Sequence, residues 1–574
     1  MRKLVTPFLL NAILVISALV LVVLSFISSN FLRKIFSYSG YYLILALFLM
    51  WIITLIQCLR IYRPSLKLFF KTYKYGLLVS LIFTSIIFIS VKSHYRVLSD
   101  ETNLLATSKS MIYERRIDNV TMGKWYYDRF YPINREMPKR PLLFPFLTHI
   151  VHTVLGYRPG NAFVLNFLVL FSLFFLIFGL IKKYLGDISA VAAVILVASQ
   201  PIISQNATSG GFDLLAVLFW VISFMSLEWF LKEPSAIRFQ LLWVNLLMFA
   251  NVRYESGLVF IIVMACLLFF RYIKLEFFRR GWGIIYFSTP LVFLLFLWPR
   301  LLVKNEFEAQ GAAFSAYYFA RNSIKFFKIF FDFNFFLPYA AIVNIIGLFS
   351  LIYFGYLFLS SRIAKEKHRM HLVIITSACI FVNWALFMSY YSGGMIDHPS
   401  ASRWFAIACV ILSLFAVILL NRIVKFNQRP AYAILLTLVM FMLYHPLSIG
   451  DRFSLAQTLP RQYRFVMDFL NKEARQGRNF LVIDNRPGQY TVHNYGAVNF
   501  DYANKNEGLL TELNNHLYRD IFVIQEIEYA TMQPTKETAL NEKYTLEPLA
   551  ESQNEAKYFI RISKVGGGVA KIEK

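Results

Sequence analysis

Two adjacent carboxylates, Asp100 and Glu101, are the residues of this sequence whose types and position most clearly suggest chemistry. They follow the apolar run 75–91, where a membrane helix would emerge into water. A carboxylate pair costs free energy at a membrane edge, which favours a function such as proton transfer. A solvated loop start is the plain alternative, and residue types alone do not separate the two.

The composition determines the class of protein in which these residues work. The chain has 574 residues, of which 57% are hydrophobic, with a mean hydropathy of +0.54. Soluble domains contain roughly 45–50% apolar residues, and repeated apolar runs of about 20 residues indicate transmembrane helices. The net charge is +25, and most Lys and Arg residues lie between apolar runs. This charge therefore indicates membrane topology and anionic lipid, not nucleic acid.

The apolar runs predict a polytopic α-helical membrane protein of about thirteen spans. The basic loop 60–74 faces the cytoplasm under the positive-inside rule, so the N-terminus is also cytoplasmic and Asp100 and Glu101 lie outside. The short apolar stretch 142–155 is expected to lie on the outer surface or to be partly re-entrant. The expected spans are 5–28, 41–59, 75–91, 161–181, 188–203, 214–231, 240–250, 257–272, 283–302, 337–360, 371–391, 404–420 and 431–444.

The composition becomes polar after this helical part. We expect a transmembrane domain at 1–449 with a long outer loop at 92–160, and a small extracytoplasmic α/β domain at 450–574. Short strand-like runs support the second domain, at 480–484, 521–526 and 558–563, with helical patterns at 461–473 and 507–518.

This topology gathers the unusual polar residues at the outer ends of the spans. An ion-coupled transporter more often carries charges near the midplane, whereas a cluster at the outer rim suits a reaction between a lipid-held substrate and a water-side partner. The gathered residues are Asp100, Glu101, Lys139, Arg140, Asp213, Arg253, Glu255, Asp397, His398 and Arg403.

Three motifs in this order resemble the GT-C glycosyltransferases, most closely the branch of protein O-mannosyltransferases and lipid A aminoarabinose transferases. They are Ser99-Asp100-Glu101, the run Lys139-Arg140-Pro141-Leu142-Leu143-Phe144-Pro145, and Gly210-Gly211-Phe212-Asp213-Leu214-Leu215-Ala216. The resemblance covers about 75–302. Two spans precede the one that leads to the acidic pair, where many relatives have only one, no Trp-Trp-Asp run occurs, and no large sugar-binding module follows. The acceptor is therefore left open.

The resemblance implies a glycosyltransferase that uses a polyprenyl-phosphate sugar, either a hexose or a pentose. Asp100 is the expected general base, which removes a proton from the acceptor hydroxyl as that hydroxyl attacks the anomeric carbon. Glu101 would orient it or act as a second acid, and pairing with a nearby cation is the alternative for Glu101. Asp213 is the expected second carboxylate, for acceptor or metal, and a helix N-cap is its alternative.

Four cations are candidates for binding the donor phosphate. Lys139 and Arg140 could hold it, or could anchor the loop beside lipid headgroups. Arg253 could reach it, or could pair with Glu255. Arg403 contacts it by analogy with the family, or extends to the membrane surface instead.

The sequence therefore predicts a multi-pass protein of the cell (inner or plasma) membrane that glycosylates a glycan, lipid or protein acceptor at the extracytoplasmic face. Its partners are the donor, the acceptor and membrane lipids. No cofactor is identified, and a divalent cation such as Mg or Mn is admitted without being required. Two alternatives remain: a transporter or flippase for a lipid-linked saccharide, and an assembly or sensor protein whose outer domain binds a partner.

Overall fold

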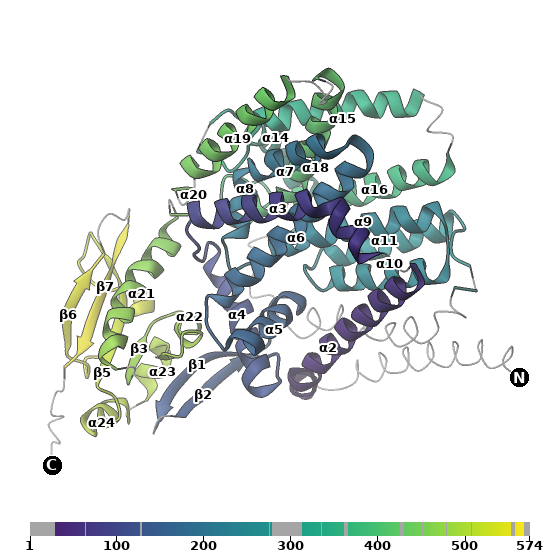
Figure 1. The fold of residues 1–574 in the computed structure, drawn as a ribbon. Coiled ribbons are helices and arrows are strands. Elements are labelled where there is room, and N and C mark those ends of the chain that lie inside the picture. Colours follow the sequence, from purple (N-terminus) through teal and green to yellow (C-terminus); the bar gives the residue numbers. More distant parts are fainter. Residues whose placement is uncertain are drawn as a thin grey trace, which may run out of the picture.

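The computed structural model is a bundle of membrane helices with a mixed sheet at one end (Figure 1). It describes residues 29–566 apart from 63–64, 127–128, 275, 278–312, 335, 361–365, 425–429, 450–451, 456, 478, 507 and 553–556. Two of the expected spans, 5–28 and 283–302, lie outside the described residues. The predicted fold class, a polytopic helical protein with a small α/β domain, is confirmed.

Seven helices in the described part of the chain are long and apolar enough to cross a membrane. They are α2 (Ser29–Tyr62), α3 (Leu66–Ser90), α6 (Asn161–Leu185), α9 (Asp213–Lys232), α15 (Ala341–Ser360), α16 (Lys367–Ser389) and the continuous segment of α17 (Pro399–Ser402), the 3₁₀ turn η2 (Arg403–Phe405) and α18 (Ala406–Val424).

Most of the remaining expected spans in the described residues are shorter or bent. Helices α7 (Asp187–Ala198) and α8 (Pro201–Ala207) meet at a 75° bend and together make an eighth candidate span. Helices α10 (Ala236–Ala250) and α11 (Ser256–Phe269) are too short to cross about 30 Å unaided, whereas α19 (Pro430–Ile449) has 20 residues. The expected count of about thirteen is therefore not confirmed.

The segment 92–160, expected to be a long outer loop, is largely ordered secondary structure, of which the sequence analysis anticipated only the apolar helix at 142–155. It contains α4 (Leu98–Glu114), a hairpin of β1 (Asn119–Tyr126) and β2 (Arg129–Glu136), and the half-buried helix α5 (Leu143–Leu155). Asp100 and Glu101 lie in the first turn of α4, where carboxylates complement the positive end of the helix dipole.

The hairpin completes the sheet of the C-terminal domain. The seven strands have the order β2-β1-β4-β3-β5-β7-β6, in which only β3 pairs in parallel, with β4 and β5. Gly123 of β1 pairs with Ala497 of β4, so the loop and the C-terminal segment share one sheet. The C-terminal strands are β3 (Phe480–Ile483), β4 (Gly496–Val498), β5 (Asp520–Glu528), β6 (Leu546–Glu551) and β7 (Tyr558–Val565).

Apolar clusters cover both faces of this sheet and continue into the junction with α4. Helix α21 (Thr458–Gln476) packs on one face, and α23 (Phe500–Lys505) and α24 (Gly508–Asn514) pack on the other. A further cluster joins Leu98 and Leu105 of α4 to Val492 just after α22 (Gly488–Thr491). The junction is therefore packed, which holds the sheet domain against the helix that carries Asp100.

Candidate active site

Glu101 fixes the start of α4 against the loop before α9. Its Oε1 accepts hydrogen bonds from the amides of Arg96 (3.0 Å) and Val97 (2.8 Å), and its Oε2 accepts one from the amide of Gly210 (2.6 Å). Burial raises the pKa of Glu101, whereas the three N–H groups act in the opposite direction because they stabilise the carboxylate. The pairing with a cation considered for Glu101 is not what the carboxylate does.

Asp100, one residue earlier, accepts hydrogen bonds from two arginines of distant segments. Its Oδ1 accepts a hydrogen bond from Nε of Arg140 at 3.0 Å, and its Oδ2 accepts one from Nη2 of Arg403 at 2.5 Å. The side chain is 9% exposed. Burial acts to raise the pKa of Asp100, but the two guanidinium groups outweigh it and hold the pKa well below its usual range. Asp100 is therefore a carboxylate at neutral pH.

Asp213 begins α9 without capping it: the N-cap residue is Phe212, and no side-chain cap hydrogen bond forms there. Its carboxylate instead pairs with Arg253 through Oδ1 and with Arg403 through Oδ2, the latter at 3.3 Å. Arg253 also pairs with Glu255. The pairing with Glu255 considered for Arg253 is therefore present, together with a second pairing to Asp213, whereas the contact with a donor phosphate stays a prediction.

We call this group of six residues the Asp–Arg cluster. It contains three carboxylates and three guanidiniums: Asp100, Asp213, Glu255, Arg140, Arg253 and Arg403. Arg403 is 8% exposed and links two carboxylates, so it does not extend to the membrane surface. Full pairing is what makes such a concentration of buried charge tolerable.

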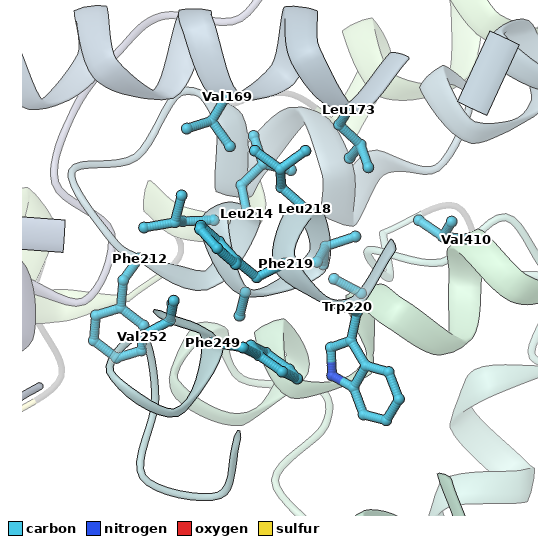
Figure 2. Packing of buried hydrophobic residues seen from close by; sticks show 14 of the residues in the cluster. Val169, Leu173, Phe212, Leu214, Leu218, Phe219, Trp220, Phe249, Val252 and Val410 are labelled. Carbon is cyan, nitrogen blue, oxygen red and sulfur yellow. The ribbon is translucent and has the colours of Figure 1, made fainter. Parts of the chain in front are cut away.

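Apolar side chains, above all the ring of Phe212, pack against the cluster. The ring of Phe212 lies 5.1 Å from Cζ of Arg253 and 5.8 Å from Cζ of Arg403, within reach of a cation–π interaction. Figure 2 shows Phe212 and Val252, the neighbours in sequence of Asp213 and Arg253, within the packed interior that also contains Phe219 and Trp220. Rigid packing next to the charged residues fixes their geometry.

Two small cavities adjoin the cluster. One of about 40 Å³ is lined by Asp213, Arg253 and Arg403 together with Trp220 and Trp404. The other, of about 10 Å³, is lined by Glu101, Asp213 and Arg403 and by two amide side chains, Gln205 and Asn206. The first combines cations with aromatic side chains, and therefore has the mixed character that a phosphate on a lipid chain requires.

Gln205 and Asn206 are site residues that the sequence analysis did not identify. Both are buried on α8, and the NH₂ groups of both, Nε2 and Nδ2, have no hydrogen-bond partner among the described residues. The bend at the start of α8 turns them toward a cavity that also touches Asp213. Their place in the polar stretch 204–211 between two apolar runs was the available signal, and it is a weak one.

Two groups of predicted residues fall elsewhere. Lys139 lines a larger cavity of about 800 Å³ on the side of the sheet domain and is not among the residues that line the two small cavities. Asp397 pairs with Lys325 at the surface (3.2 Å), and His398 caps the short helix α17 by accepting from the amide of Ser400.

The carboxylates do not fit a divalent cation as they stand. Every side-chain oxygen of Asp100 and Asp213 is already paired with a guanidinium. No group of three or more His, Cys, Asp or Glu that could hold a metal occurs in the part of the chain that the structure describes. Because divalent cations require free oxygen ligands, we derive no step through a metal.

The similarity of this chain to known proteins lies in its three-dimensional structure and not in its sequence. Neither a family model nor a curated protein sequence matches this chain. The crystal structure of ArnT from Cupriavidus metallidurans bound to undecaprenyl phosphate superimposes with a TM-score of 0.51, at 10% identity, over 87% of this chain and 99% of ArnT. The apo structure gives the same score at 11% identity, over 86% and 98%. This chain has the GT-C fold.

The GT-C fold extends over nearly the whole of both chains, including the segment after 302 where the sequence resemblance faded. A third solved structure, the Archaeoglobus fulgidus oligosaccharyltransferase in complex with Zn and sulfate, gives a TM-score of 0.43 at 9% identity, over 79% of this chain and 68% of that one. The predicted resemblance to the GT-C glycosyltransferases is confirmed for the fold.

Proposed function

We propose that this chain is a GT-C glycosyltransferase that moves a sugar from a polyprenyl-phosphate donor to an acceptor hydroxyl at the extracytoplasmic face of the membrane. The observation that carries the proposal is the Asp–Arg cluster, in which Arg403 contacts both Asp100 and Asp213 at one end of the bundle. A solved structure of the same fold holds undecaprenyl phosphate, which supports a donor of that class here.

Asp100 acts as the general base in this proposal. The acceptor oxygen forms a bond to the anomeric carbon of the sugar while the bond from that carbon to the phosphate oxygen breaks. The acceptor proton passes to Asp100, and the bonding electron pair leaves with the polyprenyl phosphate. In the free protein Asp100 is held by Arg140 and Arg403, so it becomes a stronger base when the donor phosphate draws those arginines away.

The arginines of the cluster can exchange their carboxylate partners for the phosphate of the donor. Without donor, Arg253 and Arg403 neutralise Asp213 and Asp100, and a bound phosphate would compete for the same N–H groups. Guanidinium groups already in position stabilise the negative charge that develops on the leaving phosphate without reorganising the site at that moment. Arg140 contributes from the other side of Asp100, where its guanidinium lies 6.0 Å from the ring of Tyr254.

Glu101 is a positioning residue in this scheme. Both of its carboxylate oxygens accept from backbone amides, so the side chain sets where the first turn of α4 lies relative to Gly210. We prefer this role to that of a second acid because the donors to Glu101 are backbone amides, which a donor phosphate cannot draw away as it can the arginines of Asp100.

The proposal places the cluster and the C-terminal domain outside. The basic loops support that orientation, with the N-terminus in the cytoplasm. The integral membrane character itself follows from the long apolar helices.

Release of polyprenyl phosphate is the direct test. The purified full-length chain in nanodiscs is incubated with a panel of undecaprenyl-phosphate hexoses and pentoses and with membrane-extracted acceptors, and free undecaprenyl phosphate and glycosylated product are measured. Transfer from one donor, dependent on Asp100, supports the proposal and identifies the sugar class. Movement of an intact donor across the bilayer without bond cleavage would contradict it and support the flippase alternative.

A further inference from the structure

A large cavity lies between the helical part of the protein and the sheet domain. It has a volume of about 800 Å³, within the range of small-molecule binding sites. Its walls come from the first half of α4, the β1–β2 hairpin, α17 and the C-terminal loop 485–489. Because Arg96 and Val97 line both this space and the 10 Å³ cavity beside Asp213, the two lie next to each other.

The lining of this space is unusually rich in side-chain amides, and we call it the amide-lined cavity. Its amide residues are Asn103, Asn119, Asn134, Gln457, Asn485, Gln489 and Asn499. Each amide offers both a donor and an acceptor, which is also the hydrogen-bonding character of a sugar hydroxyl.

Three of these amides have a polar atom without a partner. Oδ1 of Asn103, Nδ2 of Asn119 and Oε1 of Gln489 are buried and lack a hydrogen bond among the described residues. Asn119 is 1% exposed and Gln489 is 7% exposed. An unpaired buried polar group costs free energy that a ligand recovers when it supplies the missing hydrogen bond. Neighbouring atoms cover these three atoms, so their side chains have to turn toward the cavity before a ligand can supply one donor's or two acceptors' missing hydrogen bonds.

We infer that the amide-lined cavity binds the acceptor and that the acceptor is a hydroxyl-rich glycan. The inference rests on the proposed transferase, because it assigns the acceptor of that reaction. A lipid chain would leave the amide groups unpaired in an apolar contact.

The charges of the cavity refine this assignment. Lys139, Arg96 and Arg486 line it, and Glu136 is the one carboxylate among its described lining residues. A glycan with an acidic group is therefore favoured over one with a basic group. This also gives Lys139 a role in acceptor binding, separate from the donor phosphate to which the sequence analysis assigned it.

Binding of glycans to the inactive enzyme tests the inference without requiring turnover. The full-length chain in nanodiscs, as wild type and as Asp100→Asn, is applied to an array of immobilised neutral and acidic oligosaccharides, with a peptide array and anionic lipid vesicles in parallel. We expect glycan binding that Asp100→Asn retains. Asn103→Leu and Gln489→Leu should each weaken it about tenfold. Asn515→Leu, an exposed amide outside the cavity, serves as the matched control.

The outcomes separate this inference from the proposed function. No glycan binding, binding of peptides or vesicles alone, or equal binding by the cavity variants and the control would overturn the glycan assignment even if transfer depends on Asp100. Glycan binding that the two cavity variants lose, in a chain whose transfer is unaffected by Asp100→Asn, would uphold the cavity as a glycan site and overturn the catalytic assignment instead. Thermal unfolding of each variant identifies loss through misfolding, in which case Asn103→Asp and Gln489→Glu replace the leucine variants.

Discussion

Asp100 and Asp213 are held by one guanidinium: Nη2 of Arg403 lies 2.5 Å from Oδ2 of Asp100, and its Nη1 lies 3.3 Å from Oδ2 of Asp213. The two carboxylates come from different parts of the chain, one at the start of α4 and one at the start of α9. Two buried carboxylates this close to one another stay ionised only because the positive charge of Arg403 lies between them; burial alone would favour their protonated forms.

Replacement of Asp100 by Asn should reduce sugar transfer by at least a factor of about 100, because the general base is lost. The amide still offers one oxygen to Arg403, so the chain should fold and insert. Product formation and thermal unfolding in nanodiscs are the two measurements. Glu114→Gln is the matched control, since Glu114 ends the same helix and pairs with Arg135 away from the cluster. Wild-type turnover in Asp100→Asn would disprove the catalytic role.

Arg403→Lys should lower transfer strongly although it preserves the charge. A lysine presents a single ammonium and cannot contact both Asp100 and Asp213 in the manner of a guanidinium. Arg422→Lys, near the cytoplasmic end expected for the same helix, should have little effect because Arg422 stacks on the rings of Tyr353 and Phe354, away from the Asp–Arg cluster. Equal activity of the two variants would argue against a bridging function for Arg403.

Gly210→Ala tests Glu101 as a positioning residue. A Cβ at this position would lie 2.8 Å from Cε1 of Tyr95 and 3.1 Å from Oε2 of Glu101, so the Tyr95 ring must move and the carboxylate that holds the start of α4 is pushed from its place. We expect a fall in the rate of transfer with a smaller effect on donor binding, because the displacement acts on Asp100. Gly160→Ala, whose nearest contact would be Phe163 at 4.0 Å, is the control. Unchanged kinetics in Gly210→Ala would exclude the positioning role.

Chelation by EDTA should leave transfer nearly unchanged. Arg140, Arg253 and Arg403 already supply positive charge at the carboxylates, so a divalent cation has no free oxygen of Asp100 or Asp213 to bind before the donor arrives. The rate is measured in EDTA and after addition of Mg or Mn. Full loss in EDTA with recovery on addition of metal would assign Asp213 to a metal site.

Lys109 should make the junction more stable as the pH rises from 7 to about 10.5. Burial lowers the pKa of its ammonium to about 7, against the opposing effect of Glu114, whereas the unfolded chain keeps the usual value near 10.4. Between those values the unfolded state binds more protons, so the free energy of unfolding increases with pH. Its Nζ donates to the carbonyl of Thr491 at 2.5 Å, across the contact between α4 and the sheet domain.

The comparison of Lys109→Met with wild type measures this contribution. The unfolding temperature of the sheet domain is recorded at several pH values, and the wild-type increase should be reduced in the variant. Lys505→Met is the control, because the Lys505 side chain is 81% exposed. Parallel pH profiles for all three proteins would show that Lys109 does not titrate in this range.

The sequence by itself determined the class of the protein and pointed to five of the six residues that form the Asp–Arg cluster as candidate site residues. Apolar runs must form helices in a bilayer, because backbone polar groups have no water to bind there, and every expected span within the described residues is helical. Asp100, Asp213, Arg140, Arg253 and Arg403 were all selected from their positions at span ends. These are local signals, readable from composition and spacing.

The tertiary structure decided which of those residues meet. Sequence spacing cannot show that Arg403 contacts both Asp100 and Asp213, that Glu101 binds backbone amides while its neighbour binds arginines, or that Lys139 belongs to a separate cavity. The hairpin of the outer loop joins the C-terminal sheet through Gly123 and Ala497, a pairing between distant segments that neither segment encodes alone. Contacts of this kind depend on how the helices pack, because packing fixes the positions from which the side chains reach each other.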